Sequence, residues 1–259
     1  MRICFIVASM DKRIEFLERC IKCFRESEYA ECDIYCYFQG EKWEQVQGRE
    51  IFKDVVIDPK PRGVFTPRYE LMKRFGTDYD YLILIDDDLF IGPDTKYYKT
   101  IKFMELNKNI GATCTLNIKS WLGNKIKIVQ PGDNFNVCGG MVFSRDAVQT
   151  ILDYFADKEA DYTFDCVWLL LWVKGYDLAK DFRSFASHKT AQTRKLNGEW
   201  TGFNWSRVAL EYVPFMTEYL NPPKIVFKGH RFGYEHSIPL LSDVNEAGLK
   251  ERARCRKGS

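Results

Sequence analysis

An apolar run that ends in three adjacent acids places the strongest limit on how this chain can fold. Residues 81–85 read Tyr-Leu-Ile-Leu-Ile, and Asp86, Asp87 and Asp88 follow at once. A strand without a polar face is typical of a parallel sheet that helices cover on both sides. Such sheets bind ligands beyond the carboxyl ends of their strands, so we expect the three carboxylates at a ligand-binding edge.

Short β-rich runs alternate with helical patterns through the first half of the chain, which is the order of an α/β fold. Ser9 and Asp11 are candidate caps for the first helix, and Ser144 begins a later one. Three prolines and Gly63 predict an irregular loop that ends at Pro67. The expected strands are 3–8, 33–38, 55–57, 81–85, 110–116, 126–129 and 137–143, and the expected helices are 14–24, 68–75, 97–106, 144–155 and 165–173.

Composition narrows the class of protein. The chain has 259 residues, 46% of them hydrophobic, and can bury a sizeable core, which excludes a disordered segment. Lys and Arg total 38 against 36 Asp and Glu, so no overall charge favours a nucleic acid or a membrane. Residues 180–259 nevertheless carry 14 basic and 8 acidic side chains. A basic final third that faces an acidic site suits a metal and phosphates bound together.

No run of the sequence has the length of a membrane anchor. The apolar runs at 3–8 and 167–173 are far shorter than the roughly 20 residues that cross a bilayer. Nine cysteines, an odd number without a disulfide-like spacing, indicate a reducing compartment. We therefore expect a cytoplasmic protein with no membrane span.

The three acids are hard to hold together without a positive charge. Adjacent carboxylates repel one another at short range in a protein medium, and a divalent cation is the natural counter-charge. In an extended chain Asp86 and Asp88 point to one side and Asp87 to the other. Asp86 and Asp88 are therefore candidate ligands for a hard ion, Mn²⁺ or Mg²⁺, that carries phosphates. One alternative is a solvated acidic turn. Another is the aspartyl nucleophile of a phosphatase, but the acidic run of those phosphatases lies on the first strand, whereas the acids here follow the fourth.

In three segments the chain resembles the GT-A fold, DxD-type superfamily of nucleotide-sugar glycosyltransferases. Residues 62–68, a helix and the strand that leads into the three acids are similar to that superfamily's arginine-bearing helix and DxD strand. Residues 138–147 resemble its glycine pair, apolar strand and helix start, and residues 164–176 resemble its acid-headed helix. The resemblance covers residues 2–190. It implies a catalytic core at 1–190 with a Rossmann-like, mixed and mainly parallel sheet flanked by helices, and an irregular helical extension at 191–259 that packs on the core at the acceptor side.

The resemblance also implies how a sugar would be transferred. Asp165 would be the general base of an inverting reaction, with Asp161 as its alternative. Phe164 stands where the family has an acid, so a retaining reaction stays open. The expected acceptor contacts are Gly139, Gly140 and Trp200.

For the donor, the resemblance implies a nucleoside-diphosphate-sugar, first of all a UDP-sugar, whose diphosphate sits on Mn²⁺ or Mg²⁺. His188 would join Asp86 and Asp88 as a metal ligand, with His230 as its competitor. The expected donor contacts are Ala8, Ser9, Asp11, Gly63, Arg68, Asp86, Asp87, Lys189 and Arg194.

The expected activity is therefore that of a hexosyl- or pentosyltransferase acting on a hydroxyl acceptor, by default a glycan. An alternative acceptor is a hydroxylated base in DNA, because the basic final third, with Arg252, Arg254, Arg256 and Lys257, could contact phosphates.

Two alternatives come from outside the glycosyltransferases. A sequence that resembles a sugar-nucleotide pyrophosphorylase would have a glycine-rich loop after the first strand, whereas residues 7–13 contain no glycine. A non-catalytic nucleotide-sugar-binding module would not need the intact set of Asp86, Asp88 and Arg68.

Overall fold

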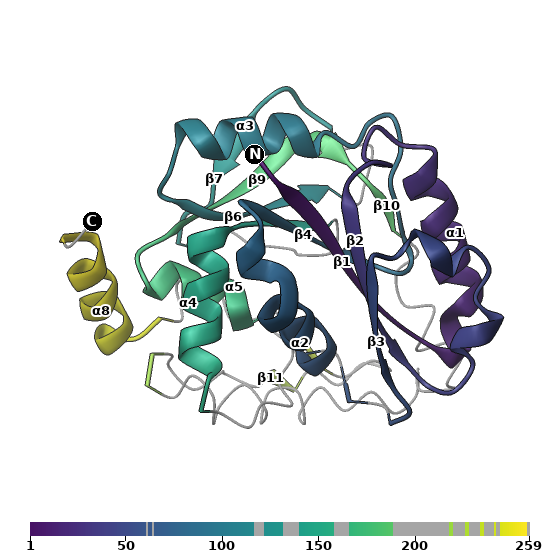
Figure 1. The fold of residues 1–259 in the computed structure, drawn as a ribbon. Coiled ribbons are helices and arrows are strands. Elements are labelled where there is room, and N and C mark those ends of the chain that lie inside the picture. Colours follow the sequence, from purple (N-terminus) through teal and green to yellow (C-terminus); the bar gives the residue numbers. More distant parts are fainter. Residues whose placement is uncertain are drawn as a thin grey trace.

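The centre of the protein is an eight-stranded sheet with the strand order β3-β2-β1-β4-β8-β6-β9-β7 (Figure 1). The computed structural model describes residues 1–60, 62–63, 65–116, 122–131, 140–157, 166–188, 218–219, 226–227, 234–235, 241 and 244–257. The sheet consists of β1 (Ile3–Met10), β2 (Asp33–Gln39), β3 (Asp54–Asp58), β4 (Tyr81–Asp86), β6 (Ile110–Leu116), β7 (Ile126–Ile128), β8 (Met141–Ser144) and β9 (Asp177–Phe185). Outside it, β5 (Leu89–Phe90) pairs with β10 (Ser187–His188), and β11 (Val226–Phe227) with β12 (Tyr234–Glu235).

The directions of the strands bring most of their carboxyl ends to one place. β8 and β7 are antiparallel to their neighbours, whereas the pairings among β1, β2, β3 and β4 and between β6 and β9 are parallel. β1, β2, β3, β4, β6 and β9 therefore end at the same edge of the sheet, which we call the carboxyl edge. The expected mixed, mainly parallel α/β sheet is confirmed.

Helices cover both faces of this sheet. The helices α1 (Ile14–Arg25) and α3 (Tyr97–Leu106) cover one face, and α2 (Phe65–Phe75), α4 (Arg145–Phe155) and α5 (Cys166–Val173) cover the other (Figure 1). Within β4, Ile83 and Ile85 belong to the first layer, and Leu82 and Leu84 to the second. Both faces of β4 are thus buried, which is the physical reason for its unbroken apolar run. Each helix in the described ranges falls short of the length and apolar character needed to cross a bilayer.

One helix begins earlier than the sequence predicts. α2 begins at Phe65 rather than at Arg68, and it includes Pro67 in its first turn. A proline is tolerated there because the first turn of a helix does not use its backbone N–H groups for intrahelical bonds. Arg68 consequently lies at the end of the first turn, close to the carboxyl edge.

The expected helix caps are correct in one case and wrong in the other. Ser144 caps α4, because its side chain accepts a hydrogen bond from the N–H of Ala147 at 3.4 Å. Ser9 and Asp11 do not cap the first helix: α1 follows a short 3₁₀ turn, Asp11–Arg13, and neither element has a side-chain cap. Both side chains instead contact other segments at the carboxyl edge, as described below.

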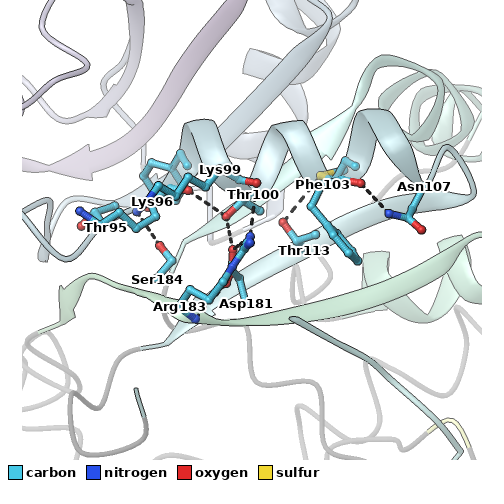
Figure 2. Close-up of polar contacts among 12 residues, drawn as sticks. Thr95, Lys96, Lys99, Thr100, Phe103, Asn107, Thr113, Asp181, Arg183 and Ser184 are labelled. Carbon is cyan, nitrogen blue, oxygen red and sulfur yellow. Dashed lines mark hydrogen bonds and ion pairs between the residues drawn. The ribbon is translucent and has the colours of Figure 1, made fainter. Parts of the chain in front are cut away.

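The sequence pattern does not predict β9, which carries a buried ionic cluster on the side of α3. Asp181 is fully buried and accepts a hydrogen bond from the Thr100 hydroxyl at 2.5 Å. The Arg183 guanidinium donates to both oxygens of the same carboxylate, each at 2.9 Å (Figure 2). We call Thr100, Asp181 and Arg183 the Asp181 triad. It fastens α3 to β9.

The last described helix, α8 (Glu246–Lys257), docks on the end of α5. The Arg252 guanidinium lies 4.1 Å from the ring centroid of Trp172, and Arg252 and Arg256 both donate to the Asp177 carboxylate. Asp177 begins β9, so α8 docks at the edge opposite the carboxyl edge. The acceptor-side placement expected for residues 191–259 stays a prediction.

Candidate functional site

The three acids that follow β4 form a turn rather than an extension of the strand. β4 ends at Asp86, and β5 begins at Leu89. The two residues between them, Asp87 and Asp88, make the turn. We call residues 86–88 the acidic turn. The expected alternation, with Asp87 opposite to Asp86 and Asp88, is wrong because side chains alternate only along an extended chain. Asp87 and Asp88 instead share one arginine.

That arginine is Arg13, which comes from the 3₁₀ turn after β1. Its Nε donates to Asp87 Oδ1 at 2.9 Å and to Oδ2 at 2.8 Å, and its Nη2 lies 2.9 Å from Asp88 Oδ2. The Ser9 hydroxyl also donates to Asp87 Oδ2, at 2.6 Å. Asp87 is 3% exposed and Arg13 8%. We call Ser9, Arg13 and Asp87 the Asp87 triad.

The electrostatics of the Asp87 triad balance burial against pairing. Burial raises the pKa of Asp87, while the hydrogen bonds and charge of Arg13 and the Ser9 hydroxyl oppose that rise. Burial also disfavours the charged form of Arg13, but the hydrogen bond and ion pair with Asp87 outweigh this effect and raise the pKa of Arg13. A buried charge is tolerated when it is paired and hydrogen-bonded, and both conditions hold here.

Asp86 has a different partner and a more open position. Arg68 of α2 donates to its carboxylate, and the Asp86 side chain keeps 30% of its surface exposed. Two guanidinium groups thus face the three carboxylates of the acidic turn. This pairing offsets much of the repulsion among the acids, so the repulsion alone no longer requires a metal.

The acidic turn nevertheless has the chemistry of a partial metal site. Carboxylate oxygens are the ligands that Mg²⁺ and Mn²⁺ prefer, and Mg²⁺ commonly binds one or two carboxylates together with substrate phosphates. In the parts of the chain that the structure describes, no three candidate ligands gather around one point. Asp86, with 30% of its side chain exposed, therefore fits a hard cation whose remaining ligands come from phosphates and water. Asp88 is 4% exposed and would join it by exchanging its contact with Arg13.

The backbone of His188 lies beside the acidic turn. β10 pairs with β5 in antiparallel register, and this places His188 opposite Leu89, the residue that follows Asp88. The backbone register is compatible with the expectation that His188 is a metal ligand, which stays a prediction because its side chain lies outside the described part.

The end of β1 also belongs to the carboxyl edge. Ala8 is in register with Asp86 on β4 and with Tyr37 on β2. The Asp11 carboxylate accepts the backbone N–H groups of Glu41 and Lys42, at 3.2 and 3.0 Å, and so fixes the loop after β2. Ala8, Ser9 and Asp11 thus lie at the carboxyl edge, where Ser9 and Asp11 contact protein groups, and their contact with a donor stays a prediction.

Two of the expected glycines also lie at this edge. Gly63 has a φ of 69°, and its carbonyl accepts a hydrogen bond from the Gln39 side chain at the end of β2, at 3.5 Å. Gly140 precedes β8 with a φ of 88°, and its carbonyl accepts a hydrogen bond from the N–H of Thr115 at 3.1 Å. A Cβ atom at Gly140 would lie 2.5 Å from the Tyr97 hydroxyl, so the backbone there approaches a buried side chain as closely as only glycine allows.

Seven residues that the sequence analysis proposes for the site lie outside the described part of the chain, and their roles stay predictions: Gly139, Asp161, Asp165, Lys189, Arg194, Trp200 and His230.

Sequence reasoning missed Arg13, although a signal for it exists. Parallel neighbours end at the same edge, so a basic residue just after β1 comes close to acids just after β4. The missing information was that β1 and β4 are neighbours, which the sequence pattern does not state.

Comparison with known proteins identifies the fold and nothing finer. No protein-family model and no curated protein matches the sequence. Among solved structures, the chain is similar to S. aureus TarS 1-349 in complex with UDP-GlcNAc, with a TM-score of 0.54 and 9% identity over 83% of this chain and 72% of that one. It is also similar to the S. aureus TarS 1-349 complex with UDP, with a TM-score of 0.53 and 9% identity over 83% and 71%. The chain spans less than half, 43%, of the longer S. aureus TarS structure that it also matches. The shared architecture shows that this chain has a GT-A-like fold.

Proposed function

We propose that the protein is a metal-dependent glycosyltransferase that moves a sugar from a nucleoside-diphosphate-sugar to a hydroxyl acceptor. The observation that carries the proposal is the position of the acidic turn and Arg68. The chain proceeds from β1 outward to β2 and β3 and then returns to the other side of β1 at β4, so the strand order reverses between β1 and β4. Open α/β sheets bind their ligands at this reversal, beyond the carboxyl ends of the strands.

The charges at the reversal suit a diphosphate. Asp86 and Asp88 would hold Mn²⁺ or Mg²⁺, which when bound supplies positive charge to the departing diphosphate. Arg68 adds a fixed positive charge at the same edge. Arg68 and Asp86 pair with each other, so donor binding would exchange this pair for contacts with phosphate and cation. The UDP and UDP-GlcNAc complexes of the similar structures favour a UDP-sugar as the donor.

The reaction itself would be a substitution at the anomeric carbon. The acceptor oxygen bonds to that carbon, the bond from the carbon to the diphosphate oxygen breaks, and a carboxylate takes the proton of the acceptor hydroxyl. Asp165 is proposed as this base, with Asp161 as the alternative, which makes the reaction inverting.

A thermal-shift panel tests the donor class. UDP-, GDP-, CMP- and dTDP-sugars are added with and without Mn²⁺, and the UDP-sugars with Mn²⁺ should raise the midpoint of unfolding because ligands that bind the folded state stabilise it. A panel in which no nucleotide sugar shifts the midpoint, with or without Mn²⁺, would refute the proposal.

The two ends of β4 provide a matched pair of variants for the activity assay. Asp86→Asn should lower sugar transfer and donor hydrolysis by about 10²-fold or more, because it removes a charge from the reacting end of the site. Asp80→Asn is the control, since Asp80 also pairs with an arginine, Arg145, but at the opposite end of the strand. Equal activity of the two variants would remove the metal assignment.

A further inference from the structure

We propose that the Asp87 triad is a preformed anchor of the acidic turn and that Asp87 positions Asp86 and Asp88 instead of contacting the donor. The proposal rests on the proposed function for its consequence, donor and metal binding. It gives Asp87, which the sequence predicts to contact the donor, a task inside the protein instead.

Burial and pairing separate Asp87 from Asp86, whereas Asp88, 4% exposed, shares Arg13 with Asp87. Asp87 is 3% exposed, and Ser9 and Arg13 donate to both of its oxygens. The Asp86 side chain, in contrast, is 30% exposed. A carboxylate enclosed in this way has little surface for a ligand, whereas a more open carboxylate can exchange its partner.

Arg13 connects the anchor to the rest of the turn. Its guanidinium pairs with Asp87 and also reaches Asp88 Oδ2 at 2.9 Å, so one planar group fixes two successive carboxylates. Arginine suits this task because its donors form a rigid fork, and lysine cannot reproduce that geometry. The positive charge of Arg13 belongs to the protein itself, so the anchor would hold the turn with or without a metal.

The neighbours of β4 explain why the anchor is rigid. Ser9 lies on β1, and Arg13 follows in the 3₁₀ turn that leads into α1. β1 pairs with β4 along its length, with Ala8 in register with Asp86. The anchor therefore ties the acidic turn to β1, the strand next to β4. In metal sites, residues that hydrogen-bond to the ligands orient those ligands in the same way.

The Asp181 triad supplies a matched control within the same molecule. It too consists of a buried carboxylate, an arginine that donates to both carboxylate oxygens and a hydroxyl that donates to one of them (Figure 2). It joins α3 to β9 and includes no part of the acidic turn. Breaking either triad should cost folding stability, and only breaking the Asp87 triad should change the site.

The test compares Arg13→Lys with Arg183→Lys by two measurements. Amide hydrogen exchange follows the segments 85–90 and 177–185, and calorimetry measures the affinity for UDP in the presence of Mn²⁺. Arg13→Lys should accelerate exchange in 85–90 and weaken UDP binding by roughly 10-fold to 100-fold, the usual cost of losing a residue that orients metal ligands. Arg183→Lys should accelerate exchange in 177–185 and leave the UDP affinity unchanged. If Arg13→Lys does not fold, Ser9→Ala and Thr100→Val replace the pair, since each removes only the hydroxyl of its triad.

Each other outcome decides against one of the two proposals. Unchanged exchange in 85–90 overturns the anchor, and faster exchange there with unchanged UDP affinity overturns the positioning role of Asp87. If the wild-type protein binds no UDP with Mn²⁺, the UDP-sugar assignment of the proposed function fails, while the exchange measurement still decides on its own whether Arg13 holds the turn.

Discussion

At the scale of single residues, Gly140 shows how a local requirement can have two explanations. A glycine pair before an apolar strand resembles a place where the backbone approaches a sugar. The structure shows a requirement inside the protein: Gly140 has a φ of 88°, and the buried Tyr97 hydroxyl occupies the space of a side chain. That hydroxyl has no hydrogen-bond partner of normal geometry among the described residues.

Gly140→Ala should therefore destabilise the protein by about 1–3 kcal/mol, because alanine is strained at positive φ and its Cβ would meet Tyr97. Urea unfolding measures the change. Gly92→Ala is the control, since a Cβ there meets nothing within 4 Å, and it should stay within about 0.5 kcal/mol of the wild type. The double variant Gly140→Ala/Tyr97→Phe should recover part of the loss. Stability equal to that of the wild type for Gly140→Ala would contradict the close approach.

At the scale of elements, β4 could be predicted and β9 could not, and burial explains both. β4 is apolar throughout because helices cover both of its faces, so its sequence shows its place. β9 lies one strand from the edge of the sheet and carries Lys180, Asp181 and Arg183 in its middle. The buried Asp181 is compatible with a strand only because Thr100 and Arg183 pair with it, and a pairing with a distant helix leaves no periodic pattern in the sequence.

The docking of α8 on α5 leads to a prediction about pH. Glu251 accepts hydrogen bonds from Arg254 and from Lys174 of the loop after α5, and these lower the pKa of Glu251 from 4.5 to about 2. A carboxylate whose pKa is lower in the folded state contributes stability above its unfolded pKa and loses it as the pH falls. The contribution should therefore be complete above pH 4.5 and decline from pH 4.5 towards pH 2.

Urea unfolding of the wild type and of Glu251→Gln at a series of pH values measures this contribution. The difference in free energy should be about 1 kcal/mol at neutral pH, since solvent screens Arg254, and should shrink as the pH falls below 4.5. Glu246→Gln on the exposed side of the same helix should show no such trend, because its ion pair with Lys250 is solvent-exposed. A constant difference across the series would mean that Glu251 does not hold α8 in place.

At the scale of the whole molecule, the site could be predicted as far as it depends on strand ends. Asp86 and Asp88 follow an apolar strand, and the carboxyl edge is where such sheets bind ligands. Arg13 could not be predicted, because its partners are fixed by which strand lies next to β1. The same limit applied to α8, whose arginines suggested a binding surface in the sequence but pair with acids of the protein in the structure.

The distribution of charge gives the last prediction, which concerns DNA as an alternative acceptor. Of the basic residues that favoured DNA, Arg252 and Arg256 pair with Asp177, Arg254 pairs with Glu251, and all lie on α8 at the edge opposite the acidic turn. Residues engaged in this way and placed far from the site would give at most weak, salt-sensitive binding to phosphates. A gel shift on plain duplex DNA should therefore show no retarded band at about 150 mM salt, whatever it shows at low salt. A retarded band that persists at this salt and is lost in Lys250→Glu/Lys257→Glu would instead make α8 a DNA-binding surface and return a nucleic acid to the possible acceptors.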